Sequence, residues 1–479
     1  MKYLLGYDLG SSSVKVSLME AATGKTLASA QSPSAEMAMI ALHEGWAEQH
    51  PEIWWAELVN ATNKLRGRFA FHPDEVGARG ISYQMHGLVL VDKDQNVLRS
   101  SIIWCDSRAV DIGNQAFTQL GERYCLENYL NSPANFTASK ARWVMENEPK
   151  IWHKVDKLPA IEQHLAGHPI AAAGHRVVHG GALYVDHQPV TAEIIAMLSE
   201  MTHLAPLHLP GNVAGMEALQ RTRSNITQIA CFDTTFHRSM PRIAQLTGLP
   251  RELFDEGIRR FGFHGLSYEY VVETLREASV EVEAERIIIA HLGNGASMCA
   301  VQAGRSIETT MGYSTLPGLL MGTRPGDVDP GIILHLLQRK GLTTEQVGSL
   351  LYERSGLRGV SDRTSDMREL LSHSHEPAVN EAIELFCYRA RYHLAALTAV
   401  LGGVDRLVFT GGIGAHAAPI RAKICQGLEY LGIFLDPAAN AADLDIISRP
   451  GSRVIVQAML SDEERGAARH VWRWIAGVA

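Results

Sequence analysis

The chain has 479 residues, more than one compact domain usually holds, so we expect two or three domains. Hydrophobic residues make up 46% and charged residues 20%, which is typical of a folded globular protein and excludes a largely disordered one. The 44 basic and 52 acidic side chains give a formal charge of −8, which argues against nucleic acid as a partner.

The sequence also indicates the cell compartment in which the protein is expected. No apolar run reaches about 18 residues, so we expect no membrane span and no membrane partner. The apolar run near Leu4 is too short for a signal peptide. The six cysteines are scattered without a C-x-x-C pair, which predicts reduced thiols in a cytoplasmic protein.

Apolar runs and turn residues predict the elements along the chain. The first part alternates apolar and polar residues in a hairpin and has Pro51 in the first turn of a helix. We expect strands at 3–9, 14–20 and 26–31, a helix at 51–68, strands at 80–92 and 97–106, and a helix at 109–130. In the second part we expect a strand at 171–181 that runs into glycines, apolar runs at 227–237, 286–297 and 405–414 that each end in a polar or glycine-rich turn, and a helix at 381–403. Strands interleaved with helices indicate an α/β protein.

Three turns at strand ends suit phosphate. The first runs from Asp8 to Lys15, where Ser11, Ser13 and Lys15 can face an anion and Asp8 can hold a hydrated Mg²⁺, although an ordinary polar hairpin explains it equally well. The other two turns comprise His291, Leu292, Gly293, Asn294 and Gly295, and Gly411, Gly412, Ile413 and Gly414. With no G-x-x-x-x-G-K-[ST] motif in the chain, they suggest a different nucleotide cleft; a dinucleotide fingerprint at 412–417 is a weak alternative.

Cationic residues next to glycine or proline form a second group. These are Arg176, His208, His264 and Arg324. Each one alone is more often structural, but several of them in an acidic chain favour an anion site. Asp233 and the pair Glu463–Glu464 are candidate carboxylates for Mg²⁺.

These segments carry two family resemblances. From about residue 160 onward, GHRVVHGG, FDTTFHRSMP, IRRFGFHG, HLGNGAS, MGTRPGDVDP and FTGGIG closely resemble the acetokinase family. Residues 1–157, through GYDLGSSSVKVSL, GWAEQHPEIWW, GISYQMHGLVLVD and IIWCDSRAV, resemble the N-terminal part of xylulokinase-type (FGGY) sugar kinases. The chain therefore looks like a hybrid. Both families imply a two-lobed actin/hexokinase-like (ASKHA, ribonuclease H-like) fold.

The resemblances imply roles for particular residues. Arg176 and Arg324 resemble arginines that contact acetate and the transferred phosphoryl group, with His208 beside them, and His264 resembles a histidine that stabilises the transition state. Asp233 resembles a catalytic, Mg²⁺-associated carboxylate, as does Glu463, with Glu464 the alternative. Ser11, Ser13, Lys15 and the two glycine turns match ATP-binding segments, and Met85, His86 and Asp106 resemble sugar-contacting positions.

The sequence departs from the acetokinase pattern at four places. Asp8 replaces Asn, as in sugar kinases, and Leu209 replaces the Asn after the APLH histidine. Gly414-Ala415-His416 stands where GEN is usual, and Ser461-Asp462-Glu463-Glu464 where TNEE is usual. The departures at 414–416 and 461–464 affect the contacts that the resemblance implies with adenosine and with the metal ion.

The hybrid character predicts four segments and a conflict between two strands. We expect residues 1–157 and 158–235 to form domain I, 236–460 to form a nucleotide-binding domain II with a dimer surface, and 461–479 to return to domain I as a helix. The strands GISYQMHG (80–87) and GHRVVHG (174–180) resemble the same strand of the two families, so we expect them to compete for one position in the first sheet.

The expected function is that of an acetate kinase. It would be a cytoplasmic homodimer that uses Mg²⁺ (or Mn²⁺) to transfer a phosphoryl group reversibly between ATP and acetate. A carboxylate acceptor is already ionised at pH 7 and needs no base, whereas a sugar hydroxyl does, and the chain has no GDQ motif to supply one. A propionate kinase, a pentulose kinase and an inactive nucleotide-binding hybrid are the alternatives.

Overall fold

In the computed structural model, the chain divides into two compact units, which are described separately below. Unit 1 contains Met1–Ala173, Ala214–Gln228 and Ala468–Ala479, and unit 2 contains Gly174–Val213 and Ile229–Ala467. The structure describes residues 2–476, except for positions 35, 44, 84–86, 95, 122–133, 135, 156–171, 206–207 and 223–224. The four segments expected from the sequence stay a prediction.

Unit 1 is built on a four-stranded sheet. The strands of this unit are β1 (Tyr3–Leu9), β2 (Val14–Glu20), β3 (Thr26–Ser32), β4 (Glu48–Gln49), β5 (Val76–Tyr83) and β6 (Ser101–Ile102). Its helices are α1 (Pro51–Arg68), α2 (Val110–Leu120), α4 (Thr137–Asn147) and α5 (Pro149–Trp152). The main sheet has the order β3-β2-β1-β5, and β4 pairs with β6 in a separate ribbon.

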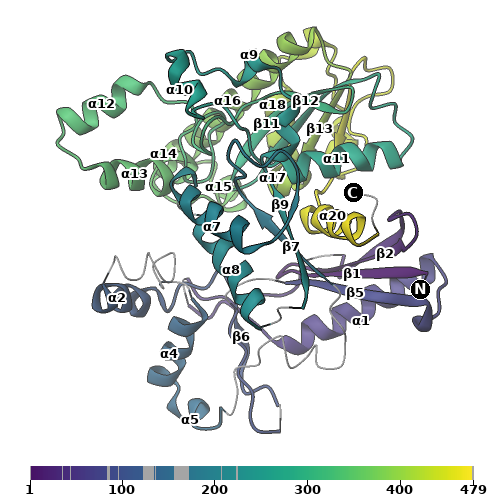
Figure 1. Ribbon diagram of the computed structural model, residues 1–479, viewed down its shortest axis with the longest axis vertical. Helices are drawn as coiled ribbons and strands as arrows, with labels where there is room; N and C mark the ends of the chain where they lie inside the picture. Colours follow the sequence, from purple (N-terminus) through teal and green to yellow (C-terminus); the bar gives the residue numbers. More distant parts are fainter. Residues whose placement is uncertain are drawn as a thin grey trace. The chain divides into compact units, whose positions relative to one another are not determined.

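The core of unit 1 lies between this sheet and α1, which runs along the sheet (Figure 1). Pro51 occupies the first turn of α1, and its helical face places Leu65 against Leu5 and Val16 of the sheet. The predicted strands at 80–92 and 97–106 are mostly wrong. β5 ends at Tyr83, residues 84–86 lie outside the described residues, and Ser101–Ile102 is the strand of the second run. The two runs pair through isolated bridges, Leu88 with Ile102 and Val91 with Val97, and their apolar residues pack in a smaller cluster with α4.

The two strands that were expected to compete occupy different sheets. β5 lies parallel to β1, with Gly6 opposite Gly80 and Leu9 opposite Tyr83. β7 (Ala172–Val177), which carries the GHRVV run, instead belongs to a three-stranded sheet of order β7-β9-β8. The position beside β1 is therefore filled by the sugar-kinase-like strand, and the acetokinase-like strand pairs elsewhere.

Unit 2 holds most of the remaining elements, and β7, β9, α8 and α20 cross the boundary between the units. Its other strands are β8 (Gln188–Pro189), β9 (Thr227–Phe232), β10 (Arg286–Leu292), β11 (Ala296–Gln302), β12 (Arg305–Thr309), β13 (Arg406–Thr410) and β14 (Ile455–Ala458). Its helices are α7 (Ala192–Glu200), α8 (Leu209–Thr222), α9 (Arg242–Gln245), α10 (Arg251–Asp255), α11 (Gly265–Glu277), α12 (Pro330–Gln338), α13 (Thr344–Glu353), α14 (Gly356–Ser361), α15 (Met367–Ser372), α16 (Pro377–Leu401), α17 (Gly411–His416), α18 (Ala418–Cys425), α19 (Pro437–Ala441) and α20 (Glu463–Ala476).

A five-stranded sheet of order β12-β11-β10-β13-β14 forms the centre of unit 2, and β10, β13 and β14 are parallel. Along β10, Ile287 and Ile289 belong to the core formed with α11, whereas Ile288 and Ala290 belong to the core formed with α16. Successive side chains of a strand point to opposite faces, so the apolar run of β10 supplies both cores. This double burial holds the carboxyl ends of β10 and β13 in place.

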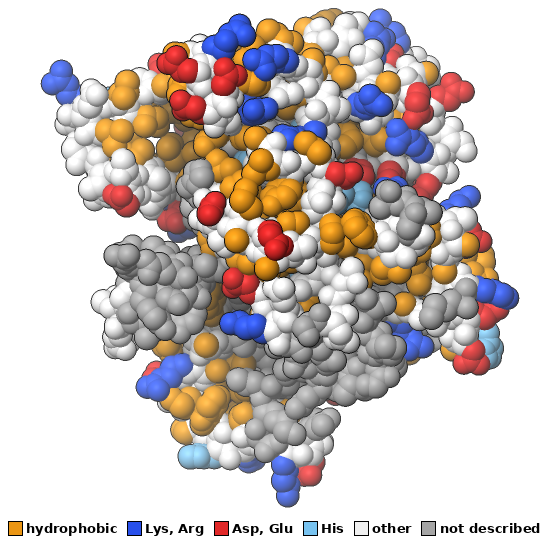
Figure 2. All heavy atoms as spheres, viewed as in Figure 1, with side chains coloured by type: hydrophobic (Ala, Val, Ile, Leu, Met, Phe, Trp, Pro, Cys, Tyr) orange, Lys and Arg blue, Asp and Glu red, His pale blue; other side chains and the backbone are white. Residues whose placement is uncertain are grey.

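The charges on the surface, the helices and the cysteines of the described residues agree with what the composition led us to expect. Figure 2 shows one face, on which basic and acidic side chains are interspersed. None of the helices in the described ranges is long and apolar enough to cross a membrane. Cys231, Cys299, Cys387 and Cys425 are buried and form no disulfide.

Candidate active site

Arg176 is the centre of a charged cluster in unit 2. It lies on β7, and Asp233 follows the adjacent strand β9, with the Asp233 amide donating to the carbonyl of Val177 at 2.9 Å. The Arg176 guanidinium donates to Asp233 Oδ2 from Nε at 3.0 Å and from Nη2 at 2.8 Å, and Nη1 pairs with Glu463. Neighbouring strand ends thus bring together residues that lie far apart in the chain.

The carboxylates keep Arg176 charged. Burial of the guanidinium opposes its charge, but Asp233 and Glu463 outweigh this and raise the pKa of Arg176. The side chain is still 45% exposed, so part of the guanidinium can meet a ligand from solvent. Arg176 is therefore an oriented, permanently charged donor.

Two stacked histidines lie beside this arginine. The rings of His264 and His291 have centroids 4.3 Å apart and planes at 24°. His264 Nδ1 lies 2.8 Å from the hydroxyl of Ser297, and His291 Nδ1 lies 2.8 Å from the hydroxyl of Ser267. These contacts fix the orientation of each ring and leave Nε2 of each as the other hydrogen-bonding atom.

Both histidines are neutral at pH 7 in this arrangement. Burial, then His291 and the positive charges of Arg176 and Arg324, lower the pKa of His264 well below its usual value. Burial and Arg176 lower the pKa of His291 to about 3. The positive charge of the cluster therefore resides on arginine, and His264 contributes as a hydrogen-bonding group.

Arg324 converges on the same place. A Cβ atom on Gly295 would lie 2.9 Å from Arg324 Nη2 and 3.2 Å from His264 Nε2, so both side chains contact the backbone of this turn. Arg324 Nη1 donates to the carbonyl of Thr315 at 2.9 Å. Loss of hydration and the charges of Arg324 and Arg176 lower the pKa of His208, which places this histidine in the cluster too.

The two glycine turns of the predicted nucleotide site meet at one edge of the five-stranded sheet. His291 of β10 lies opposite Thr410 of β13, and each strand ends there in a turn. Gly411 adopts a φ of 75°, and a Cβ on it would lie 2.6 Å from the carbonyl oxygen of Leu292. Only glycine allows the two turns to approach this closely. The second predicted turn, Gly411–Gly414, forms the first turn of helix α17 rather than a loop, and this helix has only six residues.

Arg421 holds helix α17, which contains the second glycine segment, in place. It is fully buried and donates to the carbonyls of Gly414 at 3.0 Å and Ala415 at 2.7 Å, and to the side chain of Asn440 at 2.7 Å. We expect Arg421→Met to destabilise the protein by about 3 kcal/mol or more, because these buried acceptors would lose their donor. Chemical denaturation followed by circular dichroism measures this, and a loss below about 1 kcal/mol would contradict it. Arg339→Met, at an exposed arginine, is the matched control.

Asp233 and Glu463 have the properties of a divalent cation site. Asp233 is 1% exposed, and its Oδ1 has no hydrogen-bond partner among the described residues, although Oδ2 accepts from Arg176. Burial raises the pKa of Glu463, and the charge of Asp233 adds to this effect while Arg176 opposes it. A buried, unpaired carboxylate oxygen beside a second carboxylate fits Mg²⁺ or Mn²⁺. Glu463, and not the exposed Glu464, makes the contact with Arg176.

The first phosphate turn belongs to unit 1 and is described by itself. In the β1–β2 hairpin, Asp8 lies opposite Lys15, and the Gly10 amide donates to the carbonyl of Ser13 at 3.1 Å. Ser13 is 8% exposed, and the hydroxyl of Ser11 accepts from Trp104 at 3.3 Å. The hairpin therefore has the predicted geometry, and its phosphate-binding role stays a prediction.

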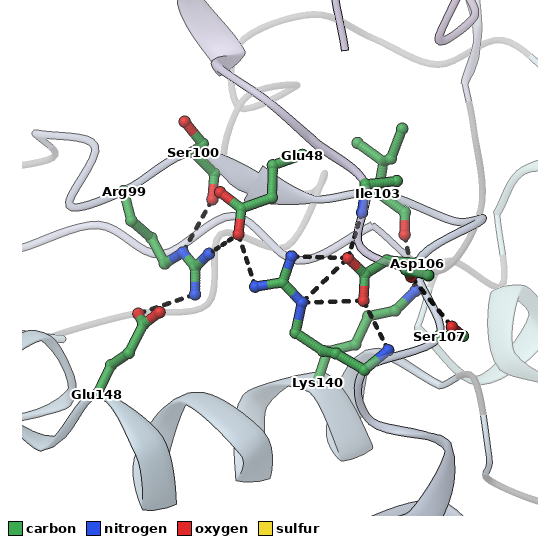
Figure 3. Close-up of polar contacts among 11 residues, drawn as sticks. Glu48, Arg99, Ser100, Ile103, Asp106, Ser107, Lys140 and Glu148 are labelled. Carbon is green, nitrogen blue, oxygen red and sulfur yellow. Dashed lines mark hydrogen bonds and ion pairs between the residues drawn. The ribbon is translucent and has the colours of Figure 1, made fainter. Parts of the chain in front are cut away.

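Of the three sugar-kinase-like positions, Met85 and His86 lie outside the described residues. Asp106 is fully buried and accepts two hydrogen bonds from Arg108 Nε, at 2.9 and 3.0 Å, and one from Nη2 at 2.7 Å. Figure 3 shows this carboxylate within a network that also includes Glu48, Arg99 and Lys140. These contacts favour a structural role for Asp106, since a sugar hydroxyl would have to displace Arg108.

Ser297 and Ser267 were not singled out from the sequence. Each serine is the last residue of a glycine-containing segment of the site, Ser297 in HLGNGAS and Ser267 in GFHGLS. Only the pairing of β10 with β11 and the start of α11 after His264 show that they hold the histidine rings. Their place in the same short segments as His264 and His291 was the only sequence feature that could have pointed to them.

Comparisons with known proteins agree with this geometry. The Acetokinase family matches residues 134–469, and the FGGY family of carbohydrate kinases, N-terminal domain, matches residues 3–168. An acetate kinase of Rhodopseudomonas palustris is 51% identical over 320 residues, covering 66% of this chain and 80% of that protein. One of Rhizobium meliloti is 45% identical over 306 residues, covering 64% and 77%.

Solved structures support the same assignment. The acetate kinase of Porphyromonas gingivalis superposes with a TM-score of 0.62 at 27% identity, and a propionate kinase of Francisella tularensis with 0.63 at 26%; each comparison covers 98% of both chains. The predicted actin/hexokinase-like α/β fold and the hybrid of two kinase families are confirmed. With its FGGY-type N-terminal segment, the chain belongs to the acetokinase family.

Proposed function

We propose that this chain is an acetate kinase, which transfers the terminal phosphoryl group of ATP to acetate and reverses the reaction from acetyl phosphate and ADP. The observation that carries the proposal is the convergence of Arg176, Arg324 and the neutral His264 in unit 2. Two anions must approach each other in this reaction, and two arginines provide the charge that allows it.

Each residue then has a defined task. Arg176 and Arg324 bind the carboxylate of acetate and the oxygens of the transferred group, and His264 Nε2 forms a hydrogen bond to those oxygens as charge develops on them. The carboxylate attacks the γ-phosphorus in line while the bond to the β-phosphate oxygen breaks. No proton has to be removed, so no general base is required. The turns at Gly295 and Gly411 support the ATP phosphates through backbone N–H groups.

Substrate preference tests the proposal. We expect purified protein with ATP and Mg²⁺ to release ADP in the presence of acetate, with propionate as a second substrate to compare. The FGGY match over residues 3–168 makes a pentulose such as xylulose the informative competitor. ADP formation that depends on xylulose and not on acetate would overturn the proposal in favour of a sugar kinase.

We also propose that Asp233 and Glu463 hold Mg²⁺ or Mn²⁺, which would offset the charge of the ATP phosphates. Asp233→Asn keeps the shape of the side chain and removes the charge. We expect it to raise the Mg²⁺ concentration needed for half-maximal activity by about tenfold or more. Chelator should abolish activity, and added Mg²⁺ or Mn²⁺ should restore it. An unchanged Mg²⁺ dependence in Asp233→Asn would exclude this site.

The raised pKa of Glu463 predicts how activity depends on pH. As pH falls, the carboxyl takes up a proton, and cation binding must then displace that proton. We expect activity at subsaturating Mg²⁺ to decline on the acid side, and higher Mg²⁺ to move this decline to lower pH. Rate profiles at two Mg²⁺ concentrations measure the shift; superimposable profiles would show that Glu463 is not linked to the cation.

We further propose a cytoplasmic homodimer formed through unit 2. Large apolar side chains of α16 are exposed, among them Tyr388 at 61%, Tyr392 at 59% and Val400 at 52%. Such residues on one helix suit an interface between two copies. Light scattering after gel filtration should give the mass of two chains, and the mass of one chain would contradict the proposal.

A further inference from the structure

A second cationic cavity lies in unit 2, outside the cluster around Arg176. Its volume is about 340 Å³, and its lining includes His237, Arg238, Gln245, Arg259, Arg260 and Phe261. A cavity of this size can hold a small organic molecule. Three adjacent arginines in a chain of net charge −8 are the unusual feature of its lining.

Two of the three arginines of this cavity have no carboxylate partner in the described part of the chain. Arg260 pairs with Glu308 at 2.7 Å and donates to the carbonyl of Ala244. Arg238 donates to the carbonyl of Ala182 at 2.6 Å, and neither it nor Arg259 has an ion pair with any described residue. Burial and the charge of Arg259 lower the pKa of Arg238, so the two guanidinium groups repel each other.

Arg259 also has a donor without a partner. Its Nε is buried and makes no hydrogen bond within the described part of the chain, while its guanidinium lies 4.5 Å from the ring centre of Phe254. A second arginine, Arg242, stacks on the same ring at 4.1 Å. A buried guanidinium donor that lacks an acceptor is costly, and an anion in the cavity would remove that cost.

The cavity shares two chain segments with the active site. The 3₁₀ turn Thr235–Ser239, which carries His237 and Arg238, begins two residues after Asp233. The second segment runs from Arg259 to His264. His237 joins them, because its Nε2 donates to the carbonyl of Phe263 at 2.9 Å, and its Nδ1 then accepts from Ser306 at 2.9 Å. The carbonyl of Asp233 also accepts from Gly265 at 2.8 Å.

From this geometry we propose that the cavity is an effector site for a small polyanion, a phosphate ester or a di- or tricarboxylate, bound by Arg238 and Arg259. Both ligand types present planar or tetrahedral oxygens that pair with guanidinium groups. Binding moves or stiffens the two shared segments and so alters the positions of Asp233 and His264. The site is separate from the one that binds acetate and ATP.

Calorimetric titration of the full chain tests binding with two probes, 3-phosphoglycerate and tricarballylate. The probe that binds identifies the ligand class. We expect Arg259→Met, which keeps packing on Phe254, to weaken binding by about 10-fold or more. Arg176→Ala should leave binding unchanged, because it alters only the active site, and Arg339→Met is the control for loss of a surface charge. Failure of both probes to bind, or binding that is lost in Arg176→Ala and kept in Arg259→Met, would overturn the proposal.

Two further measurements separate an effector site from other roles. A saturating probe should change the KM for acetate of the unmodified protein about fivefold or more and leave that of Arg259→Met unaffected. An unchanged KM would refute the effector role. Gel filtration should give the same mass for Arg259→Met as for the unmodified protein; a changed mass would assign Arg259 to an interface between copies instead.

Discussion

Replacement of Arg176 by alanine is expected to reduce kcat/KM for acetate by about 10²–10³-fold or more. Such a loss is typical when one oriented donor to a transition state is removed. Arg176 also forms ion pairs with both Asp233 and Glu463, so its loss leaves these two carboxylates without the positive charge of the guanidinium. We therefore expect the variant to lose activity through weaker stabilisation of the transferred group and through altered cation binding.

Arg176→Lys is the informative companion. It keeps the positive charge but not the fork that donates from both Nε and Nη2 to Asp233. We expect Lys to restore cation binding more than it restores kcat. Steady-state kinetics at several Mg²⁺ concentrations separate the two effects, and an Arg176→Ala protein with unchanged kcat/KM would remove Arg176 from the mechanism.

Replacement of His264 is expected to lower kcat by about 10²–10³-fold with a smaller effect on the KM for acetate. The neutral ring is fixed by Ser297 and can stabilise charge that develops during transfer. His264 adopts a φ of 61°, in the left-handed region, as it caps α11. His264→Asn suits this backbone, whereas His264→Ala adds strain of about 1 kcal/mol.

The comparison of these two variants separates chemistry from folding. We expect both to lose activity to a similar degree, while only the alanine variant melts at a lower temperature. His335→Asn, at an exposed histidine of α12, is the matched control. If His264→Asn retained full kcat, the imidazole would have only a structural role.

The sequence predicted the helices and strands that have a clear apolar pattern. It did not predict which apolar runs form strands with a distant partner, or which sheet a strand joins. The hairpin of β1 and β2 and helix α1 match the expected ranges closely, and β10 and β13 form the apolar parts of the runs at 286–297 and 405–414. The run at 97–106 has the same apolar character, yet only two of its residues form a strand. Strand pairing depends on partners that are distant in sequence, which local patterns do not encode. For the same reason the positions of β5 and β7 in different sheets could not be foreseen.

Residue types in the active site were predictable, and their charge states were not. Arg176, Arg324 and His264 stood out beside glycines, and the structure brings them together. The sequence favoured a cationic role for His264, whereas burial and the neighbouring arginines keep it neutral at pH 7. The contacts of Ser267 and Ser297 also required the structure, because they depend on how α11 and β11 pack beside the site.

The central claim is that Arg176 and its neighbours in unit 2 promote phosphoryl transfer to a carboxylate. Phosphorus NMR of the purified protein with ATP, Mg²⁺ and acetate detects the product directly. We predict that the acetyl phosphate signal grows as that of ATP declines, and that Arg176→Ala forms it at least about 100-fold more slowly. The account would be contradicted if no acetyl phosphate formed, or if Arg176→Ala formed it at the rate of the unmodified protein.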